Sequence, residues 1–166
     1  MIRNNKITIT PANSILSGHE LVVIARNARY KPKDIQINAS LDILKEWYPM
    51  CEINSEVYNT VEFVAQGQNF ESVSCNHCKK ELAIDFWQEK MDESYESTHF
   101  EDMNFITNCC NTLTNLNELI YHGDCGFASY SLIINNAELD EIREHALSKI
   151  LSATLGTSVK LFWRHI

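Results

Sequence analysis

Two pairs of cysteines are the residues in this sequence whose types and spacing could do chemistry. Cys75 and Cys78 form a C-x2-C motif in VSCNHCKKEL, and Cys109 and Cys110 lie side by side in FITNCCNTL. A C-x2-C turn brings two thiolates together on one side of the chain, and Zn²⁺ binds four such ligands tetrahedrally at about 2.3 Å. A closed site of this kind stabilises a small fold directly. The two pairs therefore predict a structural Zn²⁺ site.

The second pair is unusual because its two members are adjacent. Neighbouring residues on a strand point to opposite faces, so both thiols reach one ion only where the chain turns. A turn is reasonable here, because Asn115 and Glu118 form a capping-box pattern for a helix that begins just after the pair. If only one member binds the ion, His122 is the substitute fourth ligand, with Cys125 and His99 as further options.

Other interpretations of the cysteines compete with the metal site. Free cysteine behaves as a small hydrophobe, so all four could be ordinary buried thiols. A disulfide between Cys109 and Cys110 is a third interpretation, and Cys51 and Cys125 stand alone as core or near-surface residues. The metal site is favoured because a C-x2-C motif followed by a second pair is uncommon by chance.

The stretch between the two pairs predicts a helix that starts near Asp85. Ile84, Trp87, Met91 and Tyr95 recur at helical spacing, so they are expected to share one face and to pack against the cysteine pairs or a sheet. The opposite face is acidic. Its acidic residues are Asp85, Glu89, Asp92 and Glu93.

Outside this region the sequence predicts two halves of the same kind. The first half has a strand at Leu21–Ala25, a helix from Asp34 and a strand at Val57–Val64. The apolar residues of this helix recur at spacings of four, three and four, which places them on one face; they are Ile37, Leu41, Leu44 and Tyr48. The second half has a strand at Gly126–Ile134, a helix after Asn136 and a final strand in SVKLFWRHI. Two such halves form an α+β fold with a ferredoxin-like split βαβ arrangement, in which two helices cover one face of an antiparallel sheet.

This arrangement defines how the chain is organised. Residues 1–166 form a single domain, and residues 70–121 are a zinc-binding insertion between its two central strands. KITIT near the start is either a short edge strand or a loose arm. The helix of the second half is expected to bury a row of apolar side chains. These are Leu139, Ile142, Ala146 and Ile150.

The charge of the chain bears on its partners. Its 22 acidic and 14 basic residues give a net charge of −8, which repels phosphate backbones and favours a basic protein partner. We take Lys79–Lys80 as the densest basic run. No secretory signal or membrane-length apolar run is visible, and six cysteines without such a signal favour a reducing, cytoplasmic location.

These observations lead to one main hypothesis of function and two alternatives. Four thiolates fill a Zn²⁺ ion, and the H-E-x-x-H and deaminase motifs are absent, so catalysis is disfavoured. The leading hypothesis is a non-enzymatic, acidic protein-binding module, for example a bacterial immunity or inhibitor protein that neutralises a basic partner. One alternative is a metal-dependent hydrolase. The other is a nucleic-acid-associated regulatory protein that would use basic and aromatic residues, namely Lys79, Lys80, Lys160, Phe162, Trp163 and Arg164.

Several short motifs together resemble a family of uncharacterised bacterial zinc-ribbon-like proteins. They are C-x2-C-x3-L, FWQE-x-MD, the strand leading into CC, L-x-x-LNEL and GFASYSL, and they span about residues 70–166. The resemblance implies a zinc-ribbon-like insertion and a metal, without an established activity. It also implies that both adjacent cysteines are retained, with Cys75, Cys78, Cys109 and Cys110 as the ligand set. This chain has Asn111 where that pattern usually has glycine.

Overall fold

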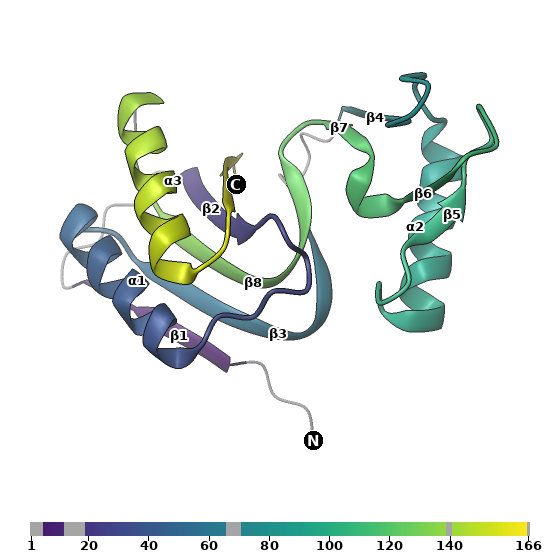
Figure 1. The fold of residues 1–166 in the computed structure, drawn as a ribbon. Coiled ribbons are helices and arrows are strands. Elements are labelled where there is room, and N and C mark those ends of the chain that lie inside the picture. The colour runs from purple at the N-terminus through teal and green to yellow at the C-terminus, as the bar shows by residue number, and fades with distance from the viewer. Residues whose placement is uncertain (1–4, 12–18, 66–70, 139–140, 166) are drawn as a thin grey trace.

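The computed structural model describes residues 5–11, 19–65, 71–138 and 141–165 (Figure 1). Within these ranges it contains one five-stranded sheet, two short two-stranded sheets and three α-helices. In chain order the elements are β1 (Asn5–Ile9), β2 (His19–Ala25), α1 (Asp34–Trp47), β3 (Ile53–Ala65), β4 (Ser72–Ser74), α2 (Ile84–Thr98), β5 (Asn104–Ile106), β6 (Leu113–Asn115), the 3-10 helix η1 (Leu116–Glu118), β7 (Ile120–His122), β8 (Cys125–Asn135), α3 (Glu141–Leu155) and β9 (Val159–His165).

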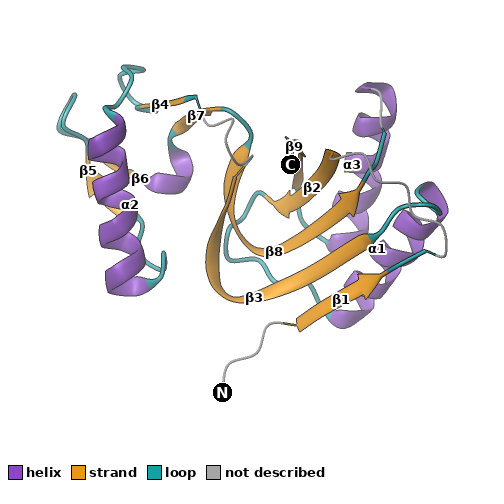
Figure 2. Ribbon diagram, turned by 180° about the vertical axis from the view of Figure 1, so that it is seen from behind, coloured by secondary structure: helices purple, strands orange, loops and turns teal. Residues whose placement is uncertain are grey.

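The large sheet has the strand order β1-β3-β8-β2-β9, and every neighbouring pair is antiparallel. Helix α1 connects β2 to β3, and α3 connects β8 to β9. Both helices lie on one face of the sheet (Figure 2). The α+β class and the antiparallel sheet are therefore confirmed. Residues of KITIT form the edge strand β1, paired with β3, so the strand alternative holds.

The second helix that packs on the sheet buries other residues than the sequence predicts. The described helix α3 (Glu141–Leu155) buries Leu147, Leu151 and Leu155. Ile150, expected on the buried side, is 37% exposed. Leu139 lies outside the described residues. The apolar residues of this segment can line more than one face of a helix. The face that packs against α1 is the one that contains Leu147.

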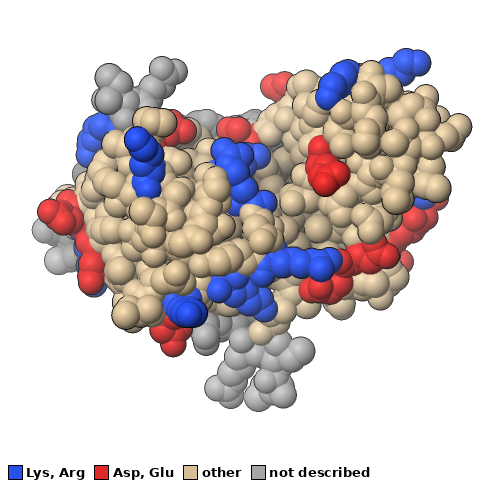
Figure 3. Space-filling model, in the orientation of Figure 1, with Lys and Arg blue, Asp and Glu red and all other residues tan. Residues whose placement is uncertain are grey.

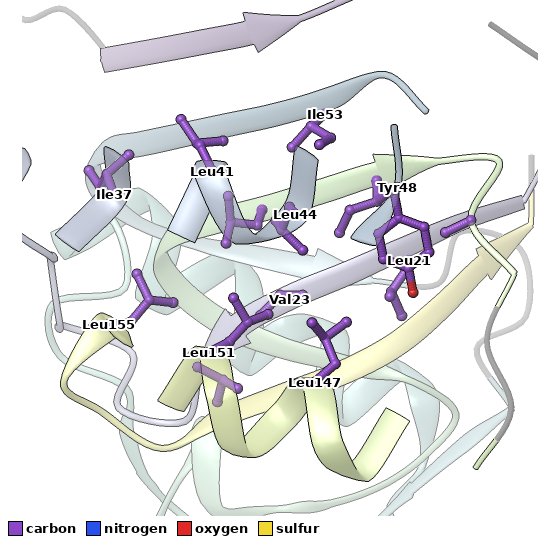
Figure 4. Close-up of a cluster of buried hydrophobic side chains, with 14 of the residues drawn as sticks. Leu21, Val23, Ile37, Leu41, Leu44, Tyr48, Ile53, Leu147, Leu151 and Leu155 are labelled. Carbon is purple, nitrogen blue, oxygen red and sulfur yellow. The ribbon is translucent and has the colours of Figure 1, made fainter. Parts of the chain in front are cut away.

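The main core lies between the two helices and the sheet. Leu41 and Leu44 of α1 meet Leu147 and Leu151 of α3 above Leu21 of β2 (Figure 4). The prediction for α1 is confirmed, because its residues at spacings of three and four are the buried ones. The opposite face of the sheet carries a smaller cluster of buried residues. They are Val22, Ile24, Val64, Ala128 and Phe162.

The elements from β4 to β7 form a smaller lobe, carried on the far ends of β3 and β8 (Figure 1). Strands β4 and β7 close the lobe at its base, with Ser72 opposite His122. Phe63 of β3 and Phe127 of β8 pack against the lobe, and their rings lie 5.9 Å from Trp87 and 5.2 Å from Phe100, respectively. The lobe is thus joined to the sheet through an aromatic contact. None of the described helices combines the length and apolar character that a bilayer span requires.

The corrected face of α3 makes a testable prediction. Leu147→Ala is expected to lower the free energy of unfolding by about 2–5 kcal/mol, because Leu147 is fully buried and a cavity remains. The matched change Ile150→Ala, one turn away on the exposed side, is expected to cost roughly 1 kcal/mol or less. Urea unfolding of both variants measures the difference. Equal losses would contradict the assigned face.

Candidate metal centre

The structure brings the four predicted cysteines together. Their sulfur atoms all lie within 4.8 Å of one another. The distance is 3.8 Å between Cys75 Sγ and Cys110 Sγ, 3.3 Å between Cys78 Sγ and Cys109 Sγ, and 3.9 Å between Cys109 Sγ and Cys110 Sγ. Four sulfurs placed tetrahedrally at about 2.3 Å from an ion lie about 3.8 Å apart. The four side chains therefore fit a metal ion such as zinc.

The first cysteine pair sits in a tight turn after β4. The Cys75 N–H donates to the Lys80 carbonyl at 2.8 Å, and the Lys79 N–H donates back to the Cys75 carbonyl at 3.0 Å. Lys79 adopts the left-handed conformation, with φ of 66°. The His77 N–H points at Cys75 Sγ, 3.4 Å away. This turn holds both thiols on one side and supplies a backbone donor to one of them.

The second turn, between β5 and β6, repeats the backbone pattern of the first. The Thr107 N–H donates to the Thr112 carbonyl at 3.0 Å, and the Asn111 N–H donates to the Thr107 carbonyl at 3.1 Å. Asn111 is left-handed, with φ of 51°, a conformation that asparagine tolerates better than most residues. Asn111 can therefore stand where a glycine is usual.

The matching of the two turns explains the adjacent cysteines. Thr107 occupies the place that Cys75 has in the first turn, and Cys110 occupies the place of Cys78. Cys109 lies at the position equivalent to His77, yet its sulfur is within 3.3 Å of Cys78 Sγ. The second turn thus has a threonine at the position of Cys75, and Cys109 supplies the fourth sulfur of the group from inside the turn.

The surroundings shift the pKa values of Cys75, Cys109 and Cys110 in different directions. Thr107 Oγ1 and Thr112 Oγ1 each lie 3.3 Å from Cys110 Sγ, and these hydroxyls lower the pKa of Cys110 to about 6. Burial and the neighbouring Cys78 thiol raise the pKa of Cys109 to about 12. Burial opposes charge on Cys75, but the backbone N–H groups of Cys78 and His77 outweigh it and lower the pKa of Cys75. A fully ionised set requires a bound cation, since four thiolates this close repel one another.

The other candidate ligands lie elsewhere and are not members of this group of four. His122 is on β7, with its Nε2 3.1 Å from Ser74 Oγ. His99 ends α2, and its ring packs 5.0 Å from the Tyr95 ring. Cys125 is buried at the start of β8, and Cys51 Sγ lies 3.6 Å from a backbone carbonyl. Because both adjacent cysteines reach the group, no substitute ligand is needed.

The capping residue after the second pair has a smaller role than the sequence predicts. The Asn115 side chain accepts a hydrogen bond from the Asn117 N–H at 2.9 Å, but the element that it caps is the short 3-10 helix η1. The turn at the cysteines is made by main-chain hydrogen bonds within residues 107–112 instead.

A basic segment escaped the sequence prediction. Residues 26–33, between β2 and α1, carry four exposed cations, and Lys79–Lys80 is therefore not the densest basic stretch. The four are Arg26, Arg29, Lys31 and Lys33. Since no two of them are adjacent, only a count over a window of several residues reveals the cluster.

No protein-family model, no curated protein and no solved structure matches this chain. The resemblance to zinc-ribbon-like proteins is therefore supported by the quoted motifs and the four-cysteine group alone.

Exchanging the ligand position within the second turn tests its geometry. Cys109→Ser should weaken Zn²⁺ binding by more than the roughly 10–100-fold that loss of an outer partner of a metal ligand costs. Adding Thr107→Cys to that variant restores a regular C-x2-C turn, so affinity should return to within about tenfold of the natural protein. Competition with a chromophoric chelator measures both, with Cys51→Ser as the unchanged control. A double variant as weak as Cys109→Ser would contradict the assigned turn.

The hydroxyl contacts to Cys110 predict a pH effect. Thr107→Val removes the largest influence that lowers the pKa of Cys110, so protons compete with the metal at a higher pH. Metal release during acidification should therefore have its midpoint at a higher pH than in the natural protein. Thr114→Val is the control, because the Thr114 hydroxyl donates to Asn76 Oδ1 at 2.6 Å. Coincident release curves for Thr107→Val and the natural protein would refute this role.

Proposed function

We propose that this chain is a non-enzymatic, zinc-containing protein-binding module that docks a basic protein partner. The observation that supports it best is the exposed acidic face of α2, a helix held in the same small lobe as the four-cysteine group. In this proposal Cys75, Cys78, Cys109 and Cys110 hold one structural Zn²⁺. Four thiolates leave the ion no open position, so its contribution is the shape of the lobe.

The architecture in this proposal has two parts. The large sheet is a ferredoxin-like split βαβ domain, since β8 lies between β2 and β3 and the two connecting helices share one face. The smaller lobe is a zinc-ribbon-like insertion. Two matched turns, each at the tip of a short antiparallel pair, support that assignment.

Helix α2 has sharply different faces. Trp87 and Met91 are buried in the lobe, each 6% exposed, whereas the acids of the helix are exposed. In the view of Figure 3, acidic side chains gather along the lower edge of this lobe. The exposed acids of α2 are Asp85, Glu89, Asp92, Glu93 and Glu96. Lys90, the one basic residue of α2, is itself paired with Glu93 at 3.2 Å. An acidic surface of this density attracts basic partners and speeds their encounter electrostatically.

The same lobe also exposes apolar side chains. Tyr95 and Ile84 of α2, which the helical spacing predicts on the packed face, are instead 47% and 45% exposed, and only Trp87 and Met91 of that set are buried. Beside the second cysteine turn, Ile106 and Leu113 face each other across β5 and β6 and are 61% and 65% exposed. Protein interfaces commonly combine a few such apolar contacts with a charged rim. A bacterial immunity or inhibitor protein that neutralises a basic effector is the concrete form of this proposal.

Charge reversal tests the docking face. The triple change of Asp85, Glu89 and Asp92 to lysine should abolish capture of basic proteins from a lysate of the native host, because it replaces the attractive face with a repulsive one. Metal content and circular dichroism establish that the variant is folded.

The matched control applies the same charge change elsewhere on the surface. Asp42, Glu46 and Glu138 are also exposed, and their change to lysine should leave capture intact. An equal loss of capture in both triple variants would show that the effect comes from net charge and not from the face of α2. Unchanged capture by the α2 variant would refute the proposed face.

A further inference from the structure

A cavity of about 170 Å³ lies where the large sheet meets the smaller lobe. One wall comes from β2, β8 and β9, on the sheet face that α1 and α3 do not cover. The other wall comes from the segment of η1 and β7 that contains Asn117, Leu119 and Tyr121. Two cations, Arg26 and Lys160, line this cavity, and none of the lining residues that the structure describes is acidic. In a chain of net charge −8, such a lining is unexpected.

The strand register places the two cations side by side. Lys160 of β9 lies opposite Ile24 of β2, and the Arg26 N–H continues the ladder by donating to the Ser158 carbonyl at 2.9 Å. Arg26 and Lys160 are therefore diagonal neighbours on one face. Such positions are about 7–8 Å apart, within reach of one small ligand.

Lys160 is held at the cavity wall. Its Nζ donates to the Cys125 carbonyl at 2.5 Å and lies 5.9 Å from the centre of the Phe162 ring. Nearby acids lie outside the lining: Asp124 precedes Cys125 in the chain, and Glu144 shares a separate depression with Arg26. Two neighbouring cations repel each other, and an anion between them would remove that repulsion and receive hydrogen bonds from both.

We propose that this cavity binds a small oxyanion, a carboxylate or phosphate group, between Arg26 and Lys160. The Asn117 amide is a third polar group in the lining, and Leu119, Tyr121 and Phe127 provide an apolar wall for a short carbon skeleton. The volume is below the roughly 300–1,000 Å³ of drug-sized sites, so the ligand is a small molecule or a single acidic group of a protein. This inference does not depend on the proposed docking face of α2.

Amide NMR titrations of the full-length, zinc-loaded protein test the proposal. The probes are inorganic phosphate, acetate, and a short peptide with a free C-terminal carboxylate beside its amidated form, all at constant ionic strength. Saturating shifts are expected at the amides of Arg26, Asn117 and Lys160. Binding of the free anions would identify a small-molecule source, and binding of the carboxylate peptide alone would identify a protein terminus. Both outcomes support an oxyanion site.

Two variants decide whether the cavity is responsible. Arg26→Gln should weaken binding at least tenfold, because it removes a charged donor from an exposed position and leaves the core intact. Lys33→Gln removes an exposed cation from the same loop outside the cavity and should leave binding unchanged. No saturation with any probe, or equal affinity in Arg26→Gln and the natural protein, would overturn the proposal.

Discussion

The structure of the smaller lobe depends on the approach of four sulfur atoms to within 4.8 Å of one another. Four thiolates at such distances repel strongly, and a divalent cation is the ordinary means by which proteins stabilise them. The lobe also has a hydrophobic cluster that includes Trp87, Met91 and Leu116, but the hydrogen bonds between its strands add little. Its strands β4, β5, β6 and β7 are three residues long, and isolated two-stranded sheets are marginal in water. The cysteine group therefore joins two turns that their own hydrogen bonds would hold only weakly.

The four-cysteine group also affects the position of surface side chains. In the chain, the first turn precedes α2 and the second follows it, so joining the turns also anchors the helix that carries the acidic face. Behind the helix, the Trp87 indole N–H lies 3.3 Å from the Tyr121 hydroxyl, which donates to the Leu116 carbonyl at 2.6 Å. Phe63 of β3 and Phe127 of β8 pack in the same cluster and so connect the lobe to the large sheet. The four-cysteine group, the acidic helix and the sheet are thus connected through packed side chains.

The features that the sequence predicted well are those set by local spacing. The buried spacing of α1, the strands at β2 and β8 and the choice of four cysteines follow from periodicity and from the C-x2-C motif. The prediction that Ile150 of α3 is buried was wrong, because the helix packs against α1 through Leu147 and Leu151 instead. The role of Thr107 was not visible, since it rests on main-chain hydrogen bonds that any residue can make. The basic segment at residues 26–33 could have been found in the sequence. It was missed because only adjacent basic residues were considered, and none of its four cations are adjacent.

The central claim is that all four cysteines, including both members of the adjacent pair, bind one Zn²⁺ ion. Zinc-edge X-ray absorption of the purified, full-length protein tests it most directly, because the fine structure reports the identity and number of the bound atoms. We expect one zinc ion per chain, bound by four sulfur atoms at about 2.3 Å and by no nitrogen or oxygen atom. A protein that folds without metal, or a zinc ion with a nitrogen or oxygen atom in place of a sulfur, would contradict it.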